Sequence, residues 1–146
     1  MSPLRSTAPP EVVRMLEKVP MFSRLSDRQL RGLTRDAKER TYAEGSVIVK
    51  QGDVGAGFYL LLDGRVDVRR KGRRLATLEV GQFFGEMALF DEQPRSADVV
   101  AAAPTRCLIL TKWAFWAFAT GQPAVLRDIL QEMARRLSET NRSLTE

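Results

Sequence analysis

Short apolar runs separated by glycines occupy the middle of the chain, from Tyr42 to Val80. Such runs suit short strands joined by tight turns, because glycine takes a positive φ at little cost. Two further apolar runs follow, and a spacing of about ten residues between runs is typical of a small β-sandwich or jelly roll. The strand candidates are residues 47–49, 58–62, 66–68, 75–78, 98–103 and 107–110. The pattern therefore predicts a mainly β protein with a jelly-roll β-sandwich.

Segments of helical composition precede and follow the β region. Residues 11–18 and 26–39 are helix candidates, and Ser26 with Gln29 can form a capping box. Residues 112–119 are also compatible with a helix, and Pro123 can open a last long helix that runs to the C-terminus. We therefore expect a flexible tail at residues 1–10 and a single domain at 11–146. Its expected parts are N-terminal helices at 11–40, a β-roll at 41–111 and C-terminal helices at 112–146.

The composition indicates a compact domain. Of the 146 residues, 44% are hydrophobic, which is normal for a packed core. No apolar run approaches the roughly 18 residues of a membrane helix, and the N-terminus lacks the apolar stretch of a signal peptide. The single cysteine, Cys107, lies in a strand candidate and is expected to be a small buried hydrophobe. These features favour the cytoplasm.

The chain contains no histidine and only one cysteine. Haem and iron–sulfur clusters would therefore lack their usual ligands, so sensing of gas or redox state through them is not expected. No cluster of histidine and aspartate could hold the metals that phosphodiesterases use. We expect a binding protein without a cofactor and not an enzyme.

The segment FGEMALFDEQPRSA, residues 84–97, carries the strongest functional signal. Gly85 has no Cβ and lets the backbone approach a ligand closely. Met87, Ala88 and Leu89 favour a helix, so one helical turn that begins at Gly85 would direct backbone N–H groups at an anion. The start of the segment is therefore suited to hold a phosphate.

Three side chains complement this arrangement. Arg95 presents a planar fork of donors that matches two phosphate oxygens and stays charged. Ser96 adds a hydroxyl donor beside it. Glu86, an ionised carboxylate, can accept a hydrogen bond from a sugar 2′-hydroxyl, which would favour ribose over deoxyribose. A plain surface turn is the alternative, because residues 91–94 are turn formers and Arg95 could pair with one of the acids.

The Gly-Glu-apolar-Ala-Leu start and the Pro-Arg-Ser-Ala end of this segment resemble the phosphate-binding cassette of the cyclic nucleotide-binding domain family. Residues 42–68 also match the family's spacing of glycines across its first strands. The resemblance implies that backbone amides and the arginine hold the cyclic phosphate, and that the glutamate takes the ribose 2′-hydroxyl. The cassette residues that it implies are Phe84, Gly85, Glu86, Met87, Ala88, Arg95, Ser96 and Ala97.

The last helix carries a heptad-like apolar stripe. Its members fall at alternating steps of four and three, with Thr140 in the one polar gap, and are Leu126, Leu130, Met133, Leu137 and Leu144. Such a stripe either packs on the protein's own roll or pairs with a second copy of the helix. In the family this helix closes over the nucleotide, and in the catabolite activator group it also forms a dimer. The resemblance therefore implies a homodimer through this helix.

Residues 132–141, EMARRLSETN, resemble the dimer helix of the catabolite activator group. This implies that Thr140 and Asn141 contact the adenine amino group, from the same and the neighbouring subunit, and that Arg136 lies near Glu86. Asn141 departs from the group's pattern, in which a hydroxyl residue stands at that position. Thr140 in an apolar seam needs a partner, since an unpaired buried polar group costs on the order of 1–3 kcal/mol. A base would satisfy Thr140, and it could also control the register of a coiled coil.

Residues 69–74, RRKGRR, concentrate positive charge in a chain whose net charge is +5. We interpret them as the solvated tip of a hairpin. Direct readout of DNA needs a recognition element such as a helix-turn-helix, and none follows the last helix of this sequence. We expect no direct DNA binding by this chain.

Three functions are compatible with these features. The first is a cyclic nucleotide receptor module for cyclic AMP, in which binding repositions the C-terminal helix and signals to an unidentified effector protein or domain. The second is the sensor half of a longer Crp-type transcription factor or ion channel. The third is a protein-interaction domain that binds no nucleotide, although the intact Glu86 and Arg95 argue against it. Cyclic GMP stays an alternative ligand, because Ser96 could contact a syn guanine.

Overall fold

The computed structural model describes residues 9–55, 57–92 and 94–145, with side chains as far as residue 142. The chain divides into two compact units. Residues 36–115 form one unit, and the described residues among 1–35 and 116–146 form the other.

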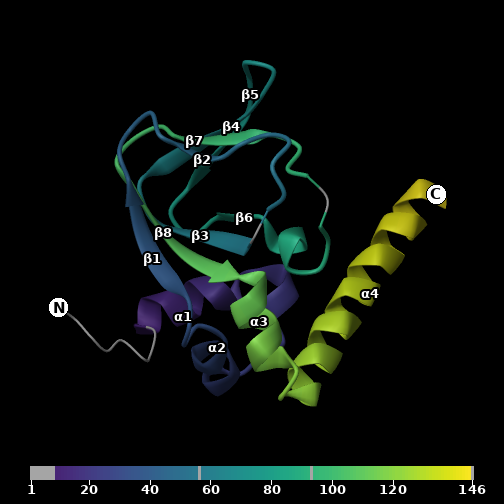
Figure 1. The fold of residues 1–146 in the computed structure, drawn as a ribbon. Coiled ribbons are helices and arrows are strands. Elements are labelled where there is room, and N and C mark those ends of the chain that lie inside the picture. Colours follow the sequence, from purple (N-terminus) through teal and green to yellow (C-terminus); the bar gives the residue numbers. More distant parts are fainter. Residues whose placement is uncertain (1–8, 56, 93, 146) are drawn as a thin grey trace. The chain divides into compact units, whose positions relative to one another are not determined.

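The unit at residues 36–115 consists of two four-stranded antiparallel sheets that face each other (Figure 1). One sheet has the order β1-β8-β3-β6, with β1 at Lys38–Tyr42, β8 at Thr105–Thr111, β3 at Gly57–Asp63 and β6 at Phe83–Phe84. The other has the order β2-β7-β4-β5, with β2 at Val47–Val49, β7 at Asp98–Ala101, β4 at Arg65–Arg70 and β5 at Arg73–Glu79. The predicted mainly β fold, a jelly-roll β-sandwich with N-terminal helices and a long C-terminal helix, is confirmed.

Side chains from both sheets meet in the interior of the sandwich. Leu61 and Cys107 come from one sheet, Val66 and Val99 from the other, and all four are buried in one cluster. The predicted burial of Cys107 is confirmed, and this burial raises the pKa of its thiol to about 11. The cluster holds the two sheets together because each sheet contributes apolar side chains that water does not reach.

Every strand candidate from the sequence lies in an observed strand, although residues 102–103 follow the end of β7. The predicted helix at residues 26–39 is wrong in its second half. Helix α2 spans Asp27–Leu33, and the hydroxyl of Thr34 donates to the carbonyl oxygen of Leu30 at 3.0 Å where the helix ends. Residues 38 and 39 instead begin β1 and pair with β8. Pairing with a central strand thus outweighs the helical composition of this segment.

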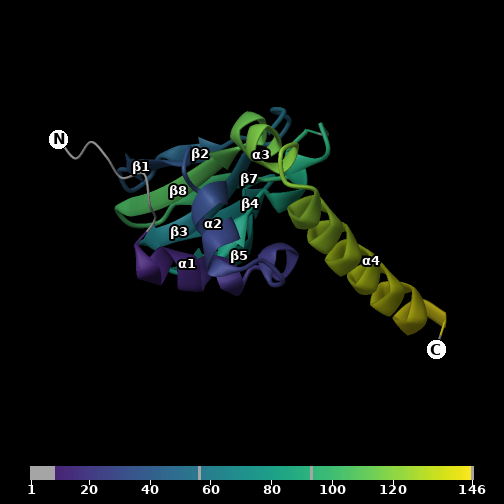
Figure 2. The same cartoon turned by 90° about the horizontal axis from the view of Figure 1, so that it is seen from below.

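The second unit is helical. It contains α1 at Pro10–Glu17, the 3₁₀ helix η1 at Pro20–Phe22, α2 and the long α4 at Pro123–Thr145, while α3 at Lys112–Ala119 spans the boundary between the units. Both hydrogen bonds of the predicted capping box are present, from the Gln29 amide to the Ser26 hydroxyl and from the Ser26 amide to the Gln29 side chain. Helix α4 is continuous over its described length (Figure 2). Within the described part of the chain, no helix is both long enough and apolar enough to span a membrane.

Candidate functional site

The cassette begins with a turn at Gly85, directly after β6. Gly85 has φ +84° and is the N-cap of the 3₁₀ helix η2, which spans Glu86–Leu89. The amide of Ala88 donates to the Gly85 carbonyl oxygen at 3.0 Å. The predicted helical turn is therefore confirmed, in its tighter 3₁₀ form. Amide groups at the start of such a turn are the donors that an anion takes.

The end of the cassette is fastened to the loop between β2 and β3. The Arg95 amide donates to the Asp53 carbonyl oxygen at 2.8 Å, and the Gly52 amide donates to the Arg95 carbonyl oxygen at 2.9 Å. Val54 and Pro94 form an antiparallel bridge beside them. These backbone bonds fix where the Arg95 side chain starts.

The guanidinium of Arg95 lies in a cradle formed largely by glycines. Its Nη2 donates to the Gly57 carbonyl oxygen at 2.8 Å. A Cβ added at Gly85 would lie 2.6 Å from Nη1, and one added at Gly55 would meet the same guanidinium. A Cβ at either position would displace the guanidinium, and at Gly85 it would also meet the Gly57 carbonyl oxygen at 2.6 Å.

One buried donor of Arg95 has no partner among the described residues of this cradle. Its Nε is buried, and nothing in the described residues 9–55, 57–92 and 94–145 accepts a hydrogen bond from it. Burial lowers the pKa of the guanidinium from a very high starting value, so the group remains a cation. Glu92, one of the two acids in the preceding turn, pairs instead with Lys112 at 3.0 Å. The site thus holds a charged fork with a free donor, which is the arrangement that a phosphate oxygen matches.

An open cavity of about 380 Å³ lies against Arg95. Its volume falls in the range of about 300–1,000 Å³ that is typical of small-molecule sites. The residues that line it are Val47, Ile48, Val49, Lys50, Asp53, Val54, Gly55, Tyr59 and Arg95. The sequence predicted only Arg95 among them. The closely spaced glycines at 52, 55 and 57 were the available signal for a loop that folds over a ligand.

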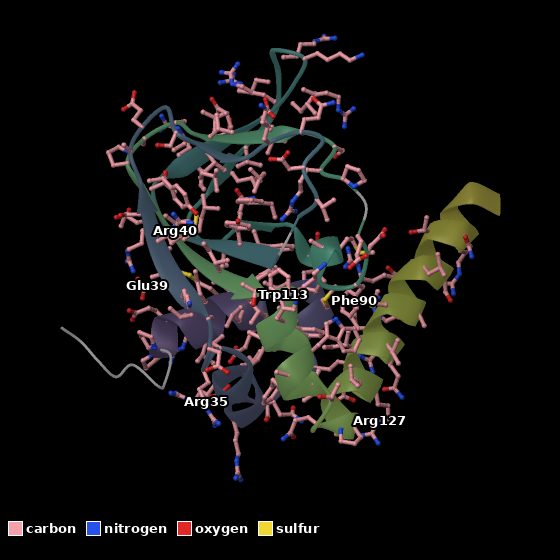
Figure 3. The ribbon with its side chains drawn as sticks, viewed as in Figure 1. Arg35, Glu39, Arg40, Phe90, Trp113 and Arg127 are labelled. Atoms are coloured by element: carbon pink, nitrogen blue, oxygen red, sulfur yellow. The ribbon has the colours of Figure 1, made fainter. Side chains whose placement is uncertain are left out.

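The other predicted cassette residues lie close by in the same unit. Phe84 stacks on Tyr59, Glu86 and Ala88 are half-buried in η2, and Ala97 is buried directly before β7. Ser96 is exposed, and its carbonyl oxygen accepts a hydrogen bond from Nε of Arg70 at 3.0 Å. Met87 is 52% exposed. Phe90, labelled in Figure 3, packs edge-on against Phe115 with 5.3 Å between ring centroids and so anchors the turn after η2.

The three predicted ligand contacts of the last helix belong to the helical unit. Arg136, Thr140 and Asn141 lie in α4, and their contacts with a nucleotide stay predictions. Thr140 is exposed, and its hydroxyl donates to the carbonyl oxygen of Arg136 at 3.1 Å. The idea that Thr140 requires a base or a coiled-coil partner is therefore wrong, since its own helix satisfies the hydroxyl.

The apolar stripe of α4 is displaced from the buried face of the helix. Val125 and Ile129 are buried, whereas Leu130 and Leu137 are each 62% exposed. Leu130 and Leu137 therefore do not pack within the helical unit, and packing of the stripe on the β-roll stays a prediction. The side chain of Leu144, the last predicted member, lies outside the described residues.

Metal-ligating side chains do not form a metal site in the part of the chain that the structure describes. Groups of three or more Cys, Asp or Glu residues that could hold a metal ion are absent from it. The charged side chains that line the cavity are Arg95, Lys50 and Asp53, and the apolar ones are valines and one isoleucine.

Comparison with known proteins shows a family whose model matches this chain. The family model described as "Cyclic nucleotide-binding domain" matches residues 39–121. The cyclic AMP receptor protein of Thermus thermophilus is 35% identical over 130 residues, which are 86% of this chain and 60% of that protein. A cGMP-dependent protein kinase of Plasmodium berghei is 30% identical over 133 residues, 86% of this chain and 16% of the kinase.

A solved structure is also similar to this chain. The N-terminal domain of a transcriptional regulator from Streptomyces coelicolor superposes with a TM-score of 0.83 at 31% identity, over 89% of this chain and 94% of that one. The chain spans less than two thirds of the length of the curated relatives named above. The family model covers more than half of the sequence, and the solved structure shares the fold of this chain. The chain belongs to the cyclic nucleotide-binding domain family.

Proposed function

We propose that this chain is a cyclic nucleotide receptor module and that its preferred ligand is cyclic AMP. The observation that carries the proposal is the buried Nε of Arg95, for which the described residues supply no acceptor. An unsatisfied buried donor costs about 1–3 kcal/mol. An equatorial oxygen of a cyclic phosphate would satisfy it and would also neutralise the guanidinium charge.

The surroundings of Arg95 support a nucleotide over a free phosphate. The cavity beside the guanidinium is larger than a phosphate ion needs, and Val47, Ile48 and Val49 give it an apolar wall. Such a wall suits the ribose and base, which bind mainly through apolar contact. Arg95 and the apolar wall together match a ligand that has an anionic group and an apolar part.

Glu86 is the residue that we assign to the sugar. It is the first residue of η2, directly after the Gly85 turn, and it is half-buried. Its carboxylate can accept a hydrogen bond from a 2′-hydroxyl. Glu86→Ala should therefore weaken binding less than Arg95→Ala does, and should reduce the preference for cyclic AMP over its 2′-deoxy form.

Support for cyclic AMP over cyclic GMP comes from α4. A relative named for cyclic AMP and a relative named for cyclic GMP are 35% and 34% identical, so the relatives do not discriminate between the two ligands. Thr140 occupies a position that resembles one contacting the adenine amino group in the catabolite activator group, whereas Asn141 departs from that pattern. Cyclic GMP is the competing ligand that a binding experiment must include.

We further propose that α4 carries the signal. Binding becomes a signal only when the bound and free proteins differ in their contacts with another molecule. The exposed Leu130 and Leu137 lie one heptad apart, which suits pairing with a second copy of α4. Repositioning of this helix on binding would change the dimer or its contact with an effector.

Calorimetric titration of nucleotide-stripped protein with cyclic AMP and cyclic GMP tests the proposal. We expect saturable binding that is tighter for cyclic AMP. Arg95→Ala should weaken it by about 2–5 kcal/mol, because the phosphate charge loses its partner. At about 1.4 kcal/mol per decade this is at least a tenfold loss.

Arg40→Ala is the matched control. Arg40 also lies over a tyrosine ring, 5.7 Å from the centroid of Tyr42, but it belongs to β1. The control should bind as the parent does. Absence of binding by the parent, or equal affinity in Arg95→Ala, would show that the proposed function is wrong.

A further inference from the structure

Both ends of the cassette meet at one tyrosine. The rings of Tyr59 and Phe84 are nearly parallel, with 4.7 Å between centroids and 7° between planes. The guanidinium of Arg95 also lies over the Tyr59 ring, with its Cζ 5.9 Å from the ring centroid. Phe84 directly precedes Gly85, and Arg95 stands near the other end of the cassette. The Tyr59 ring therefore connects two residues that are eleven positions apart in sequence.

The position of Tyr59 is itself well defined. It lies on β3, in the centre of a sheet, and is paired in register with Phe84 of β6 and with Ile109 of β8. Its side chain packs against the buried core cluster and also lines the cavity. A ring held in this way offers a fixed surface to the neighbouring guanidinium.

Two contacts from the same strand hold the Arg95 fork. Gly57, the first residue of β3, accepts from Nη2 at 2.8 Å, and Tyr59 supplies the ring surface. A hydrogen bond alone leaves a guanidinium free to rotate about that bond, whereas an aromatic surface also restricts the orientation of its plane. Neither contact uses Nε, which is buried and has no acceptor among the described residues.

We propose that Tyr59 is a positioning residue of the phosphate site: its ring, backed by Phe84, holds the Arg95 guanidinium so that Nε is presented to the ligand phosphate. This rests on the proposed function, since it assigns a part in nucleotide binding. Tyr59 acts through Arg95, and the preformed orientation raises affinity because less freedom is lost on binding.

Affinity measurements with ring-preserving and ring-deleting variants test this role. Tyr59→Leu should lower the affinity for cyclic AMP by roughly tenfold, and Tyr59→Phe should keep it within about twofold, because phenylalanine retains the aromatic surface. Tyr42→Leu is the matched control, since Tyr42 also packs against the core cluster and lies under an arginine, Arg40 of β1. It should bind as the parent does.

The combination of Tyr59→Leu with Arg95→Ala separates positioning from direct contact. If Tyr59 acts through the guanidinium, Tyr59→Leu causes no further loss once Arg95 is absent. A further tenfold loss in the Arg95→Ala background would show that the ring contacts the nucleotide directly, and would overturn the proposal. Equal binding by Tyr59→Leu and the parent would overturn it as well.

A measurement without ligand tests the contact itself. The chain has two tyrosines, so Tyr42→Phe leaves Tyr59 as the only phenol to titrate. Burial raises the pKa of Tyr59, and the Arg95 cation lowers it more than Arg40 does. In the Tyr42→Phe background, Arg95→Gln should therefore raise the pKa of the Tyr59 phenol, and Arg40→Gln should raise it less. The ¹³C chemical shift of the labelled tyrosine ring, measured against pH, gives this pKa.

The two measurements distinguish the possible failures. An unchanged phenol pKa in Arg95→Gln would show that ring and guanidinium do not interact, and the positioning role would be wrong whatever the ligand. A raised phenol pKa in a protein that binds neither cyclic nucleotide would overturn the proposed function, and the ligand role of Tyr59 with it.

Discussion

Gly85 and Arg95 are so close that an added Cβ at Gly85 would lie 2.6 Å from Nη1 of Arg95. The same Cβ would also lie 2.6 Å from the Gly57 carbonyl oxygen, which accepts from Arg95. Gly85 also has φ +84°, in the left-handed region. The turn that opens the cassette therefore depends on glycine for two separate reasons, its backbone conformation and the space that the guanidinium occupies.

Substitution of Gly85 can separate these two reasons. Gly81 has φ +88° and no atom within 4 Å of an added Cβ, so Gly81→Ala introduces backbone strain alone. Such strain costs roughly 1–2 kcal/mol of unfolding free energy. Gly85→Ala should cost more than Gly81→Ala and should weaken nucleotide binding at least tenfold, because Arg95 must move. Urea unfolding and calorimetry of both variants measure the two effects. Equal stability losses and unchanged binding in Gly85→Ala would contradict this account of the cradle.

The cassette could be predicted from sequence because its signals are local. Gly85, Glu86 and the turn formers before Arg95 lie within one short segment, and each has a conformational or chemical property that is visible without a partner. The surroundings of the Arg95 side chain could not be predicted in this way. Gly57 and Tyr59 reach it because β3 pairs with β6 and because the loop before β3 bonds to the backbone of Arg95, contacts between segments far apart in the chain.

The elements that the sequence did not predict have weak local patterns. The strand β1, KERTY, is almost wholly exposed, so it shows no alternation of apolar and polar residues, and its charged residues resemble the end of a helix. The strand β6 contains only two residues. Both are strands because neighbouring strands supply hydrogen bonds, which composition does not reveal.

Cys107 should be nearly inert to thiol reagents in the folded protein. It is fully buried in β8, and burial raises its thiol pKa to about 11, so little thiolate forms at pH 8. Since β8 lies between β1 and β3, exposure of the thiol requires that the sheet opens. Labelling with an aromatic disulfide should therefore be slow in buffer and fast in urea, with the same midpoint as unfolding followed by circular dichroism. Rapid labelling of the native protein would contradict this prediction.

Glu132 of α4 should make the helical unit sensitive to acid. Its carboxylate accepts hydrogen bonds from Arg135 and from Arg24, and these bonds lower its pKa to about 2. Because the folded-state pKa lies below the ordinary value of 4.5, the ionised group stabilises the folded state at neutral pH, and this contribution is lost as the pH falls from about 4.5 towards 2.

Urea unfolding at several pH values checks this contribution. Glu132→Gln should have a lower midpoint than the parent at pH 7, and the difference should shrink through that acidic range. Glu139→Gln is the control, because Glu139 also pairs with Arg135 but is exposed. Its effect should be small at every pH. A difference between Glu132→Gln and the parent that does not change with pH would assign the loss to packing and not to charge.

The exposed leucines of α4 should form a dimer interface. Leu130 and Leu137 are each 62% exposed within one chain, so replacing both with glutamate should leave the unfolding midpoint of the monomer nearly unchanged. If the stripe pairs with a second α4, the seam would hold four carboxylates, two from each subunit, and their repulsion would separate the subunits; light scattering would show a shift from dimer mass to monomer mass. The control is the pair Gln131→Glu and Ser138→Glu, which adds the same charge at the same spacing on exposed positions one residue further along. This control variant should remain dimeric. If the unsubstituted protein is monomeric at the concentrations used for calorimetry, with and without cyclic AMP, the dimer has no part in the proposed signalling mechanism.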